Sequence, residues 1–299
     1  MSTTDLAIET TGLTKRFGRL VAVDDVALQV PAGSVYGYLG RNGAGKTTTI
    51  QMLMGMLEPT AGTMSVLGFD PFTQDVPMKR VVSYVPERVH MWDWMTVADL
   101  MAFGAGVHPN WDAAYSENLR TRLDLPVDRK LGHLSRGMQG KAALLTALAS
   151  HPKLLLLDDP TMGLDALVRR EFMESIVAVL QEAGTTIFFS SHILDDVERV
   201  ADWIGILHEG KLVVQSPLED LKASVKRIIA TFPEAPVGLD LPGVLQQESD
   251  GRQQVIVCHE CEAAVEKLRA AGATAVQVED CSLEDIFVAY VRTVPKVPV

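Results

Sequence analysis

The residues from Gly40 to Thr47 constrain the fold of this chain more than any other part of its sequence. They read Gly-Arg-Asn-Gly-Ala-Gly-Lys-Thr and match the phosphate-loop pattern G-x-x-x-x-G-K-[ST]. The glycines let successive backbone N–H groups point at phosphate oxygens, and the helix that follows adds its positive N-terminal end. An apolar strand pattern precedes the loop and a helical pattern follows it, which favours a nucleotide site over a chance glycine-rich turn. We therefore expect Lys46 to neutralise the β- and γ-phosphates and the Thr47 hydroxyl to contact Mg²⁺.

Residues 1 to about 221 alternate short apolar runs with longer helical patterns, which indicates an α/β domain with a largely parallel sheet. Two further apolar runs flank Glu209-Gly210 and predict a late hairpin, so the whole sheet is expected to be mixed. Residues from about 90 to 150 have helical spacing and few β-branched residues, and they predict a helical subdomain inserted between strands. The buried strands are predicted at Ser34–Leu39, Val81–Val85, Leu154–Leu157 and Thr185–Phe189, and the hairpin strands at Ile204–Leu207 and Lys211–Gln215.

Residues 222–299 have a different pattern and predict a small, separate α+β module. Ser282 is expected to cap the last helix, with Asp285 three residues further on in the place of the usual Glu or Gln. The module could be regulatory, a dimer clamp or purely structural, and its sequence does not decide between these roles. Its strands are predicted at Arg227–Phe232, Gln253–Cys258 and Thr274–Glu279, and its helices at Glu262–Ala271 and Ser282–Val291.

The charge balance limits the partners of the chain. Its formal net charge is −11, which gives no support to a nucleic-acid binder and disfavours direct docking on anionic lipid. The N-terminal residues do not resemble a secretory signal, no apolar run reaches the roughly 20 residues of a spanning helix, and three cysteines do not suggest a disulfide scaffold. We expect a cytoplasmic protein that reaches a membrane only through a protein partner.

Two carboxylates follow the predicted strand Leu154–Leu157. Ligands bind at strand ends in α/β sheets, so Asp158 and Asp159 are candidates for a second part of the nucleotide site. We expect Asp158 to hold Mg²⁺, directly or through water, and Asp159 to polarise the attacking water as general base. The alternative is a solvated acidic turn, which is common after strands.

The order of these motifs resembles that of the ATP-binding-cassette (ABC) ATPases. Leu134-Ser135-Arg136-Gly137-Met138-Gln139 lies before the acidic strand, Pro160-Thr161-Met162-Gly163-Leu164-Asp165 lies after it, and a histidine, His192, comes late. The resemblance covers residues 1 to about 221 and implies a P-loop NTPase cassette. The variant signature run, with the tail segment Ser282-Leu-Glu-Asp-Ile-Phe287, looks most like the branch that drives bacterial multidrug, sodium or polysaccharide exporters.

The resemblance implies a role for each residue that matches a family motif. Phe17 stands where an aromatic ring stacks on adenine, Ser135 and Gly137 would face the γ-phosphate bound by a second subunit, and His192 would contact the γ-phosphate as the switch histidine. Asp165 would line the subunit interface. The residues implied in nucleotide binding around the P-loop are Gly40, Arg41, Asn42, Gly43, Ala44, Gly45, Lys46, Thr47 and Thr48.

Two residues depart from the family pattern. Glu87 follows Tyr84-Val85-Pro86 where the family usually has Gln; it can still be an oxygen ligand of Mg²⁺, but it adds negative charge near the metal. Asp159 stands where the family has Glu, and its side chain is shorter by one methylene, or roughly 1.5 Å. A misplacement of about 1 Å can cost about 100-fold in rate, so we expect slow turnover with intact ATP binding.

Two other features of the sequence remain open. Cys258, His259, Cys261 and Cys281 could offer soft ligands for zinc, but they lack the regular paired spacing of structural zinc sites, and a strand that runs into a helix is the simpler interpretation. Trp92 and Trp94 flank an acidic residue just after Glu87. They either contact a membrane partner or pack the helical subdomain.

Together these patterns predict the ATP-binding and ATP-hydrolysing subunit of an ABC transporter, which uses ATP and Mg²⁺. One P-loop and one signature run per chain imply that two ATP-binding subunits close head to tail on two ATP molecules and drive a separate transmembrane permease. One alternative is a soluble cassette ATPase that acts on nucleic acid or ribosomes, and the other is a regulatory nucleotide-binding module with little hydrolysis. The cargo and the choice between homodimer and heterodimer stay open.

Overall fold

The computed structural model describes residues 5–181, 184–236 and 238–293. The chain divides into two compact units, Met1–Gln215 and Ser216–Val299. The sequence predicted this division near residue 221, which lies within helix α8 (Leu218–Ser224). The division instead precedes α8, so the whole of that helix belongs to the second unit.

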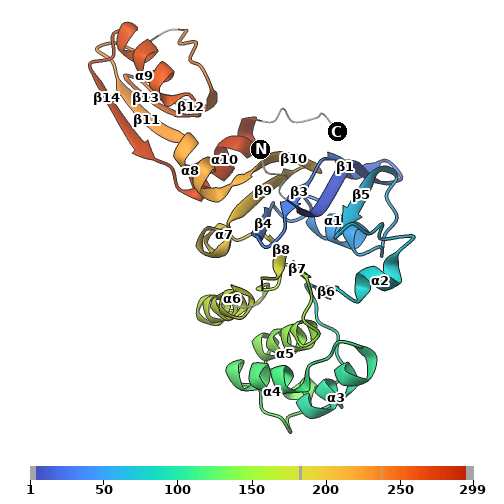
Figure 1. Cartoon of the computed structure of the whole chain (residues 1–299). Helices are drawn as coiled ribbons and strands as arrows, with labels where there is room; N and C mark the ends of the chain where they lie inside the picture. Colours follow the sequence, from blue (N-terminus) through green and yellow to red (C-terminus); the bar gives the residue numbers. More distant parts are fainter. Residues whose placement is uncertain (1–4, 182–183, 237, 294–299) are drawn as a thin grey trace. The chain divides into compact units, whose positions relative to one another are not determined.

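A six-stranded sheet forms the centre of the first unit (Figure 1). The pairs β4–β8, β4–β9, β6–β7 and β7–β8 are parallel. Residues of β7 and β8 are buried along their whole length, as expected for strands covered on both faces. The four buried strands predicted from the sequence are confirmed. In spatial order the strands are β10 (Lys211–Pro217), β9 (Trp203–His208), β4 (Val35–Leu39), β8 (Thr186–Ser191), β7 (Leu154–Asp158) and β6 (Val82–Val85).

The predicted hairpin joins β9 to β10 and makes the sheet mixed. Its two connecting residues, Glu209 and Gly210, have φ angles of 48° and 82°. Two consecutive positive φ values are characteristic of the type I′ turn that links antiparallel neighbours. The mixed sheet is therefore confirmed.

A second, antiparallel sheet in the first unit was not predicted. Strand β1 (Leu6–Phe17) pairs with β2 (Leu20–Val26), β3 (Gln29–Pro31) and β5 (Ala61–Val66). The register of β1 shifts against all three partners, so its apolar residues do not keep a strict alternation. Because of this irregularity, the alternation of apolar and polar residues did not predict the strand.

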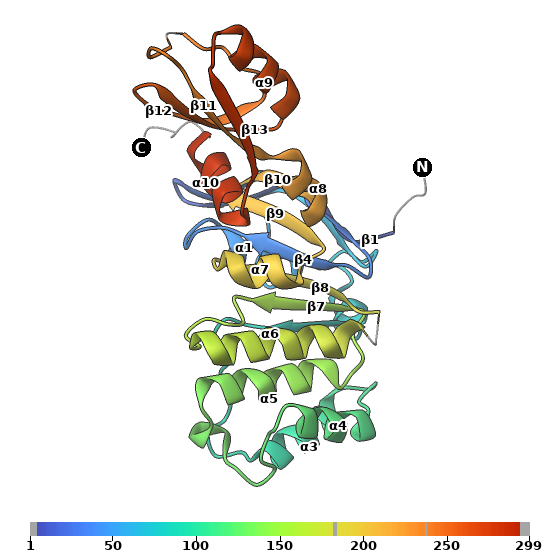
Figure 2. The same cartoon turned by 90° about the vertical axis from the view of Figure 1, so that its left-hand side faces the viewer.

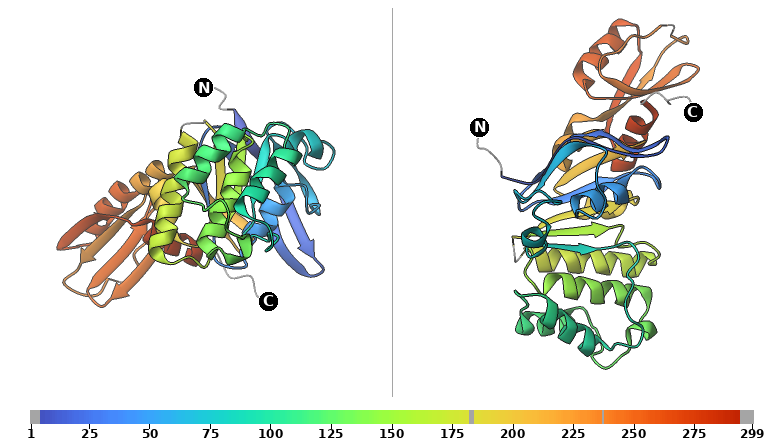
Figure 3. Two further views of the ribbon diagram at one scale, coloured as in Figure 1. Left: turned by 90° about the horizontal axis from the view of Figure 1, so that it is seen from below. Right: turned by 90° about the vertical axis from the view of Figure 1, so that its right-hand side faces the viewer.

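Helices cover the central sheet and extend the unit beyond β6 and β7. Helices α3, α4 and α5 lie together on the side away from the antiparallel sheet (Figures 1 and 3), within the residue range where the sequence predicted helices. Helices α5 and α6 run side by side (Figure 2). The helices of this unit are α1 (Lys46–Leu53), α2 (Asp75–Lys79), α3 (Val97–Val107), α4 (Ala113–Arg122), α5 (Arg136–Leu148), α6 (Ala166–Gln181) and α7 (Leu194–Val200), with a 3₁₀ turn at Leu131–His133.

One glycine in the core decides where α7 lies. A Cβ atom on Gly37, in the middle of β4, would be 2.5 Å from a methyl carbon of Val197. Since real Cβ contacts are longer than this, only glycine lets α7 pack so closely on β4. This packing fixes the helix that follows His192. Close by, the core contains the rings of Tyr36 and Phe188, which are stacked with centroids 5.4 Å apart.

The second unit is a four-stranded antiparallel sheet in the order β12-β13-β11-β14. Helix α9 packs on one face of this sheet, where its buried Leu268 joins Ile228 and Ile256 in one apolar cluster. Ser282 and Asp285 exchange the hydrogen bonds of a capping box, as predicted. Strand β12 was missed because Gln246–Asp250 is entirely polar. The elements after α8 are β11 (Lys226–Thr231), β12 (Val244–Asp250), β13 (Gln253–Cys258), α9 (Cys261–Ala270), β14 (Ala275–Asp280) and α10 (Leu283–Thr293).

None of the helices in the described residues combines the length and the apolarity that crossing a membrane requires.

Candidate functional site

The loop between β4 and α1 requires glycine at several positions. Gly43 and Gly45 have φ angles of 82° and 109°, and a Cβ on Gly45 would lie 2.3 Å from the carbonyl oxygen of Ala22. A Cβ on Gly40 would lie 2.7 Å from the carbonyl oxygen of Leu207. These contacts allow only glycine, and they leave the backbone N–H groups of the loop beside the N-terminus of α1, where an anion is stabilised.

Lys46 is the buried cation of this loop. Its side chain is 6% exposed, and Nζ donates to the carbonyl oxygen of Gly40 at 2.8 Å. Burial lowers the pKa of Lys46, while the nearby Asp159, Asp158 and Glu87 carboxylates act in the opposite direction. Nζ also lies 3.9 Å from Oδ2 of Asp159. The loop therefore holds a positive charge between the backbone amides and the acidic strand end.

Thr47, Asp158 and Ser190 form a hydrogen-bonded chain across three elements. The Thr47 hydroxyl donates to Oδ1 of Asp158 at 3.0 Å, and the Ser190 hydroxyl donates to the same oxygen at 2.8 Å. Asp158 is 1% exposed, and burial raises its pKa while these two hydrogen bonds lower it. Hydroxyl and carboxylate oxygens are the donors that Mg²⁺ prefers, so this group fits that ion.

Asp159 has a backbone conformation that is uncommon among residues other than glycine. Its φ angle is 43°, in the left-handed region where Asp and Asn are enriched. Its backbone N–H donates to the hydroxyl of Ser190 at 2.9 Å, and its two carboxylate oxygens lie 3.0 and 2.9 Å from Nδ1 of His192. The structure thus brings Lys46, Asp159 and His192 together at the carboxyl ends of β7 and β8.

Ser190 was not identified as a site residue from the sequence. Its hydroxyl donates to Asp158 and accepts from the backbone of Asp159, and its side chain is fully buried. A buried serine at the end of an apolar strand, beside a strand that ends in two aspartates, is a signal that could have indicated this role.

We expect Ser190→Ala to slow ATP hydrolysis about 10-fold or more, because both aspartates lose a hydrogen bond that orients them. The measurement is the single-turnover rate with saturating ATP and Mg²⁺. Ser150→Ala is the matched control, since Ser150 is also a buried serine, and its hydroxyl donates to the nearby carbonyl oxygen of Ala147. A Ser190→Ala rate equal to that of the control would contradict the role of Ser190.

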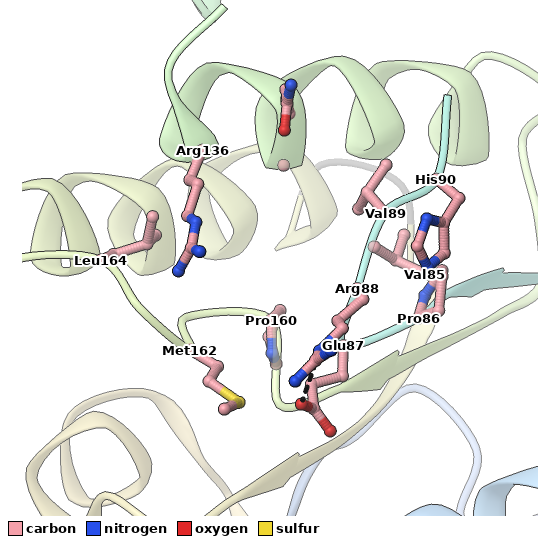
Figure 4. Close-up of a pocket in the computed structure, with 12 residues that line it drawn as sticks. Val85, Pro86, Glu87, Arg88, Val89, His90, Arg136, Pro160, Met162 and Leu164 are labelled. Carbon is pink, nitrogen blue, oxygen red and sulfur yellow. Dashed lines mark ion pairs between the residues drawn. The ribbon is translucent and has the colours of Figure 1, made fainter. Parts of the chain in front are cut away.

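Glu87 lies on the loop after β6 and lines a cavity of about 370 Å³. Figure 4 shows Glu87 and Arg88 on one side of it and Arg136, from the start of α5, on the other. Nε of the exposed Arg88 is 3.9 Å from Oε1 of Glu87, so this ion pair is weak. Pro160, Met162 and Leu164 also line this cavity, so the loop after Asp159 borders the same space as the start of α5.

The signature residues lie at the N-terminus of α5. Ser135 caps this helix by accepting the backbone N–H of Met138 at 3.3 Å, and it is exposed. A Cβ on Gly137 would lie 2.7 Å from a methyl carbon of Val168, so glycine permits the close packing of α5 on α6. Figures 1 and 2 show α1 and α5 on opposite sides of β7. In a single chain the signature residues therefore lie apart from the P-loop.

Phe17 ends β1 and is 48% exposed, with Nζ of Lys15 lying 5.3 Å from the centre of its ring. Nearly half of the Phe17 surface is therefore accessible. Asp165 caps α6 by accepting the backbone N–H of Val168 at 3.0 Å. Both placements leave these residues available to a ligand or a neighbouring chain.

The two features that the sequence left open have different outcomes. Cys258 ends β13 and Cys261 begins α9, which confirms the strand-to-helix interpretation. In the part of the chain that the structure describes, no three His, Cys, Asp or Glu side chains are grouped to hold a metal ion. Trp92 and Trp94 are 53% and 67% exposed, although Trp92 also packs edge-on against Phe103.

Comparisons with known proteins agree with this geometry. The family model described as "ABC transporter" matches residues 23–162. The bacitracin transport ATP-binding protein BcrA of Bacillus licheniformis is 37% identical over 219 residues, which are 72% of this chain and 71% of that protein. The chain belongs to the ABC transporter family.

Two further relatives support the assignment. The daunorubicin/doxorubicin resistance ATP-binding protein DrrA of Streptomyces peucetius is 35% identical, with 73% of this chain and 68% of that protein covered. A solved ATP-binding subunit of an ABC transporter is 28% identical, with a TM-score of 0.64 over 73% of this chain and 92% of that one. This ABC protein is the ATP-binding subunit of a transporter, and ATP hydrolysis in its family is coupled to transport.

Proposed function

We propose that this ABC subunit powers an exporter. We also propose that its hydrolytic site lies at the carboxyl ends of β7 and β8, around Lys46, Asp158, Asp159 and His192. The single observation that carries the proposal is the contact of Asp159 with His192 beside the P-loop, at 2.9–3.0 Å. The direction of transport is inferred from relatives whose names describe bacitracin transport and resistance to daunorubicin and doxorubicin.

In the proposed complex, the adenine of ATP stacks on Phe17 and the phosphates lie along residues 40–48. Thr47 and Asp158 would hold Mg²⁺, with Glu87 as a further oxygen ligand. The metal would neutralise charge on the β- and γ-phosphates. The hydrogen bond from Thr47 to Asp158, at 3.0 Å, supports this ligand pair because it already places both oxygens at the phosphate end of α1.

The proposed reaction is attack of water on the γ-phosphorus of ATP, which breaks the bond to the bridging oxygen and releases ADP and phosphate. Asp159 accepts hydrogen bonds from the water and takes its proton as the new bond forms. His192 holds Asp159 through Nδ1 and contacts the γ-phosphate, and Lys46 balances the charge that develops on the phosphate oxygens. The protein therefore contributes mainly position and charge.

We expect Asp159→Glu to raise the single-turnover rate, because the longer side chain restores roughly 1.5 Å of reach toward the water. A gain of about 10-fold or more is expected, since about 1 Å of misplacement can cost about 100-fold. The measurement is hydrolysis of bound ATP at saturating Mg²⁺, with ATP affinity measured in parallel. Asp195→Glu, a change at an exposed aspartate on α7, is the control. An unchanged rate would contradict slow turnover as the consequence of Asp159.

The proposed working unit is a head-to-tail pair of ATP-binding subunits. The signature residues Ser135 and Gly137 lie apart from the P-loop of their own chain, as Figures 1 and 2 show for α5 and α1, which supports a role at the ATP of a second subunit. Asp165 would line the contact between the subunits. A partner subunit that carries Glu at the position of Asp159 is an alternative to a homodimer.

The permease is the proposed membrane partner, and the exposed Trp92 and Trp94 are the proposed contact. Their location supports this choice, because both follow Glu87 in the chain and are exposed. Trp92 also lines a surface hollow with His90 and with Leu100 of α3. A tagged pull-down from detergent-solubilised membranes tests the assignment. Recovery of a multi-span protein is expected, and recovery of ribosomes or nucleic acid alone would favour a soluble cassette ATPase instead.

A further inference from the structure

Asp196 is a buried carboxylate that the proposed reaction does not use. It lies on α7, four residues after His192, and is 8% exposed. The Thr161 hydroxyl donates to its Oδ2 at 3.0 Å, and Nε of Arg169 lies 3.1 Å from its Oδ1. Three segments therefore meet at one side chain: α7, the loop after β7, and α6.

The loop that Asp196 holds is the one that carries Asp159. The backbone N–H of Met162 donates to the carbonyl oxygen of Asp159 at 3.0 Å, and that of Leu164 donates to the carbonyl oxygen of Thr161 at 3.2 Å. These two short-range bonds make the residues from Asp159 to Leu164 a compact turn. A shift of Thr161, two residues after Asp159, would therefore move Asp159.

Asp159 and His192 come from neighbouring strands, so their contact depends on how the two strand ends are held. One link between them is the contact of His192 Nδ1 with the two carboxylate oxygens of Asp159, at 2.9–3.0 Å. The hydrogen bond from Thr161 to Asp196 is a further link between the same two segments. Thr161 is 2% exposed, so water does not compete for its hydroxyl.

We propose that Asp196 is a positioning residue for ATP hydrolysis, which sets the distance between Asp159 and His192 by holding Thr161. The inference rests on the proposed function of those two residues. Arg169 pairs with Oδ1 of Asp196, the carboxylate oxygen that does not accept from Thr161. This pair offsets the free-energy cost of burying the charged carboxylate. The same group thus ties the turn that leads to Asp165 to the helix that follows His192.

The test is the pair of variants Thr161→Val and Thr161→Ser in the full chain. Valine keeps the shape of threonine but removes the hydroxyl, whereas serine keeps the hydroxyl. We expect Thr161→Val to lower the single-turnover rate about 10-fold, while the Kd for ATP changes less than about twofold, because only the position of Asp159 is disturbed. Thr161→Ser should restore most of the rate.

Two further measurements separate positioning from a purely structural role. Thr10→Val removes another buried, hydrogen-bonded hydroxyl, in the antiparallel sheet of the first unit. It should lower the midpoint of thermal unfolding without lowering the hydrolysis rate. Asp196→Leu leaves no acceptor for the Thr161 hydroxyl, so it should slow hydrolysis at least as much as Thr161→Val. The double variant should fall little further than the slower single variant, since both changes break one interaction.

The inference is overturned if Thr161→Val hydrolyses ATP at the wild-type rate, if Thr161→Ser is as slow as Thr161→Val, or if the losses of the two single variants multiply. Failure of the wild-type chain to hydrolyse ATP would overturn the proposed function and this inference with it. A wild-type rate that is measurable and unaffected by Thr161→Val overturns the inference alone.

Discussion

Replacing Asp159 with asparagine is expected to lower the single-turnover rate of ATP hydrolysis about 1,000-fold, in the range that a general base contributes. Asparagine has the same shape and tolerates the left-handed backbone that Asp159 adopts at φ 43°, so the fold should be retained. The amide cannot take a proton from water, whereas the phosphate site around Lys46 is unchanged. ATP affinity should therefore stay within about threefold of the wild-type value.

The control for this variant is Asp195→Asn, which changes an exposed aspartate three residues after His192. It should leave both rate and affinity unchanged. Hydrolysis by Asp159→Asn within a factor of about three of the wild-type rate would exclude Asp159 as the base. Glu87 would then be the next candidate, because it is the other carboxylate that influences the pKa of both Lys46 and Asp158.

Replacing Lys46 with methionine should abolish both measurable hydrolysis and tight ATP binding. Lys46 donates to the carbonyl oxygen of Gly40 and lies 3.9 Å from Asp159, so its loss leaves the phosphate site facing uncompensated carboxylates. We expect ATP affinity to fall about 100-fold and the rate about 1,000-fold, since charged donors on a transferring phosphoryl group supply losses of this order. Equilibrium binding of a fluorescent ATP analogue and single-turnover hydrolysis measure the two effects.

Lys79→Met is the matched control for Lys46→Met. Lys79 forms an exposed ion pair with Asp75 within α2, and such pairs contribute little to stability. Its replacement should change neither affinity nor rate. If Lys46→Met bound ATP as tightly as this control, the proposed phosphate site would be wrong, and the P-loop would have only a structural role.

The sequence alone determined the parts of this protein that depend on residues close together in the chain. The spacing of Gly40, Gly45 and Lys46 predicted the P-loop, and the structure agrees because a left-handed φ angle at Gly45 and a close backbone contact at Gly40 require glycine. Apolar runs predicted the buried strands, since a parallel sheet covered on both faces needs continuous apolar segments. Patterns of period two failed at β1, where register shifts break the alternation, and at the polar strand β12.

Only the tertiary structure decided which side chains meet at the site. Ser190 reaches Asp158 and Asp159, and His192 reaches Asp159, because β7 and β8 are parallel neighbours and end at the same edge of the sheet. The bond from Thr161 to Asp196 likewise joins residues 35 positions apart. Sequence spacing predicts that strands end in polar residues, but it does not give their order in the sheet. The physical reason is that this order is set by the packing of the whole unit, including the close approach of α7 to Gly37.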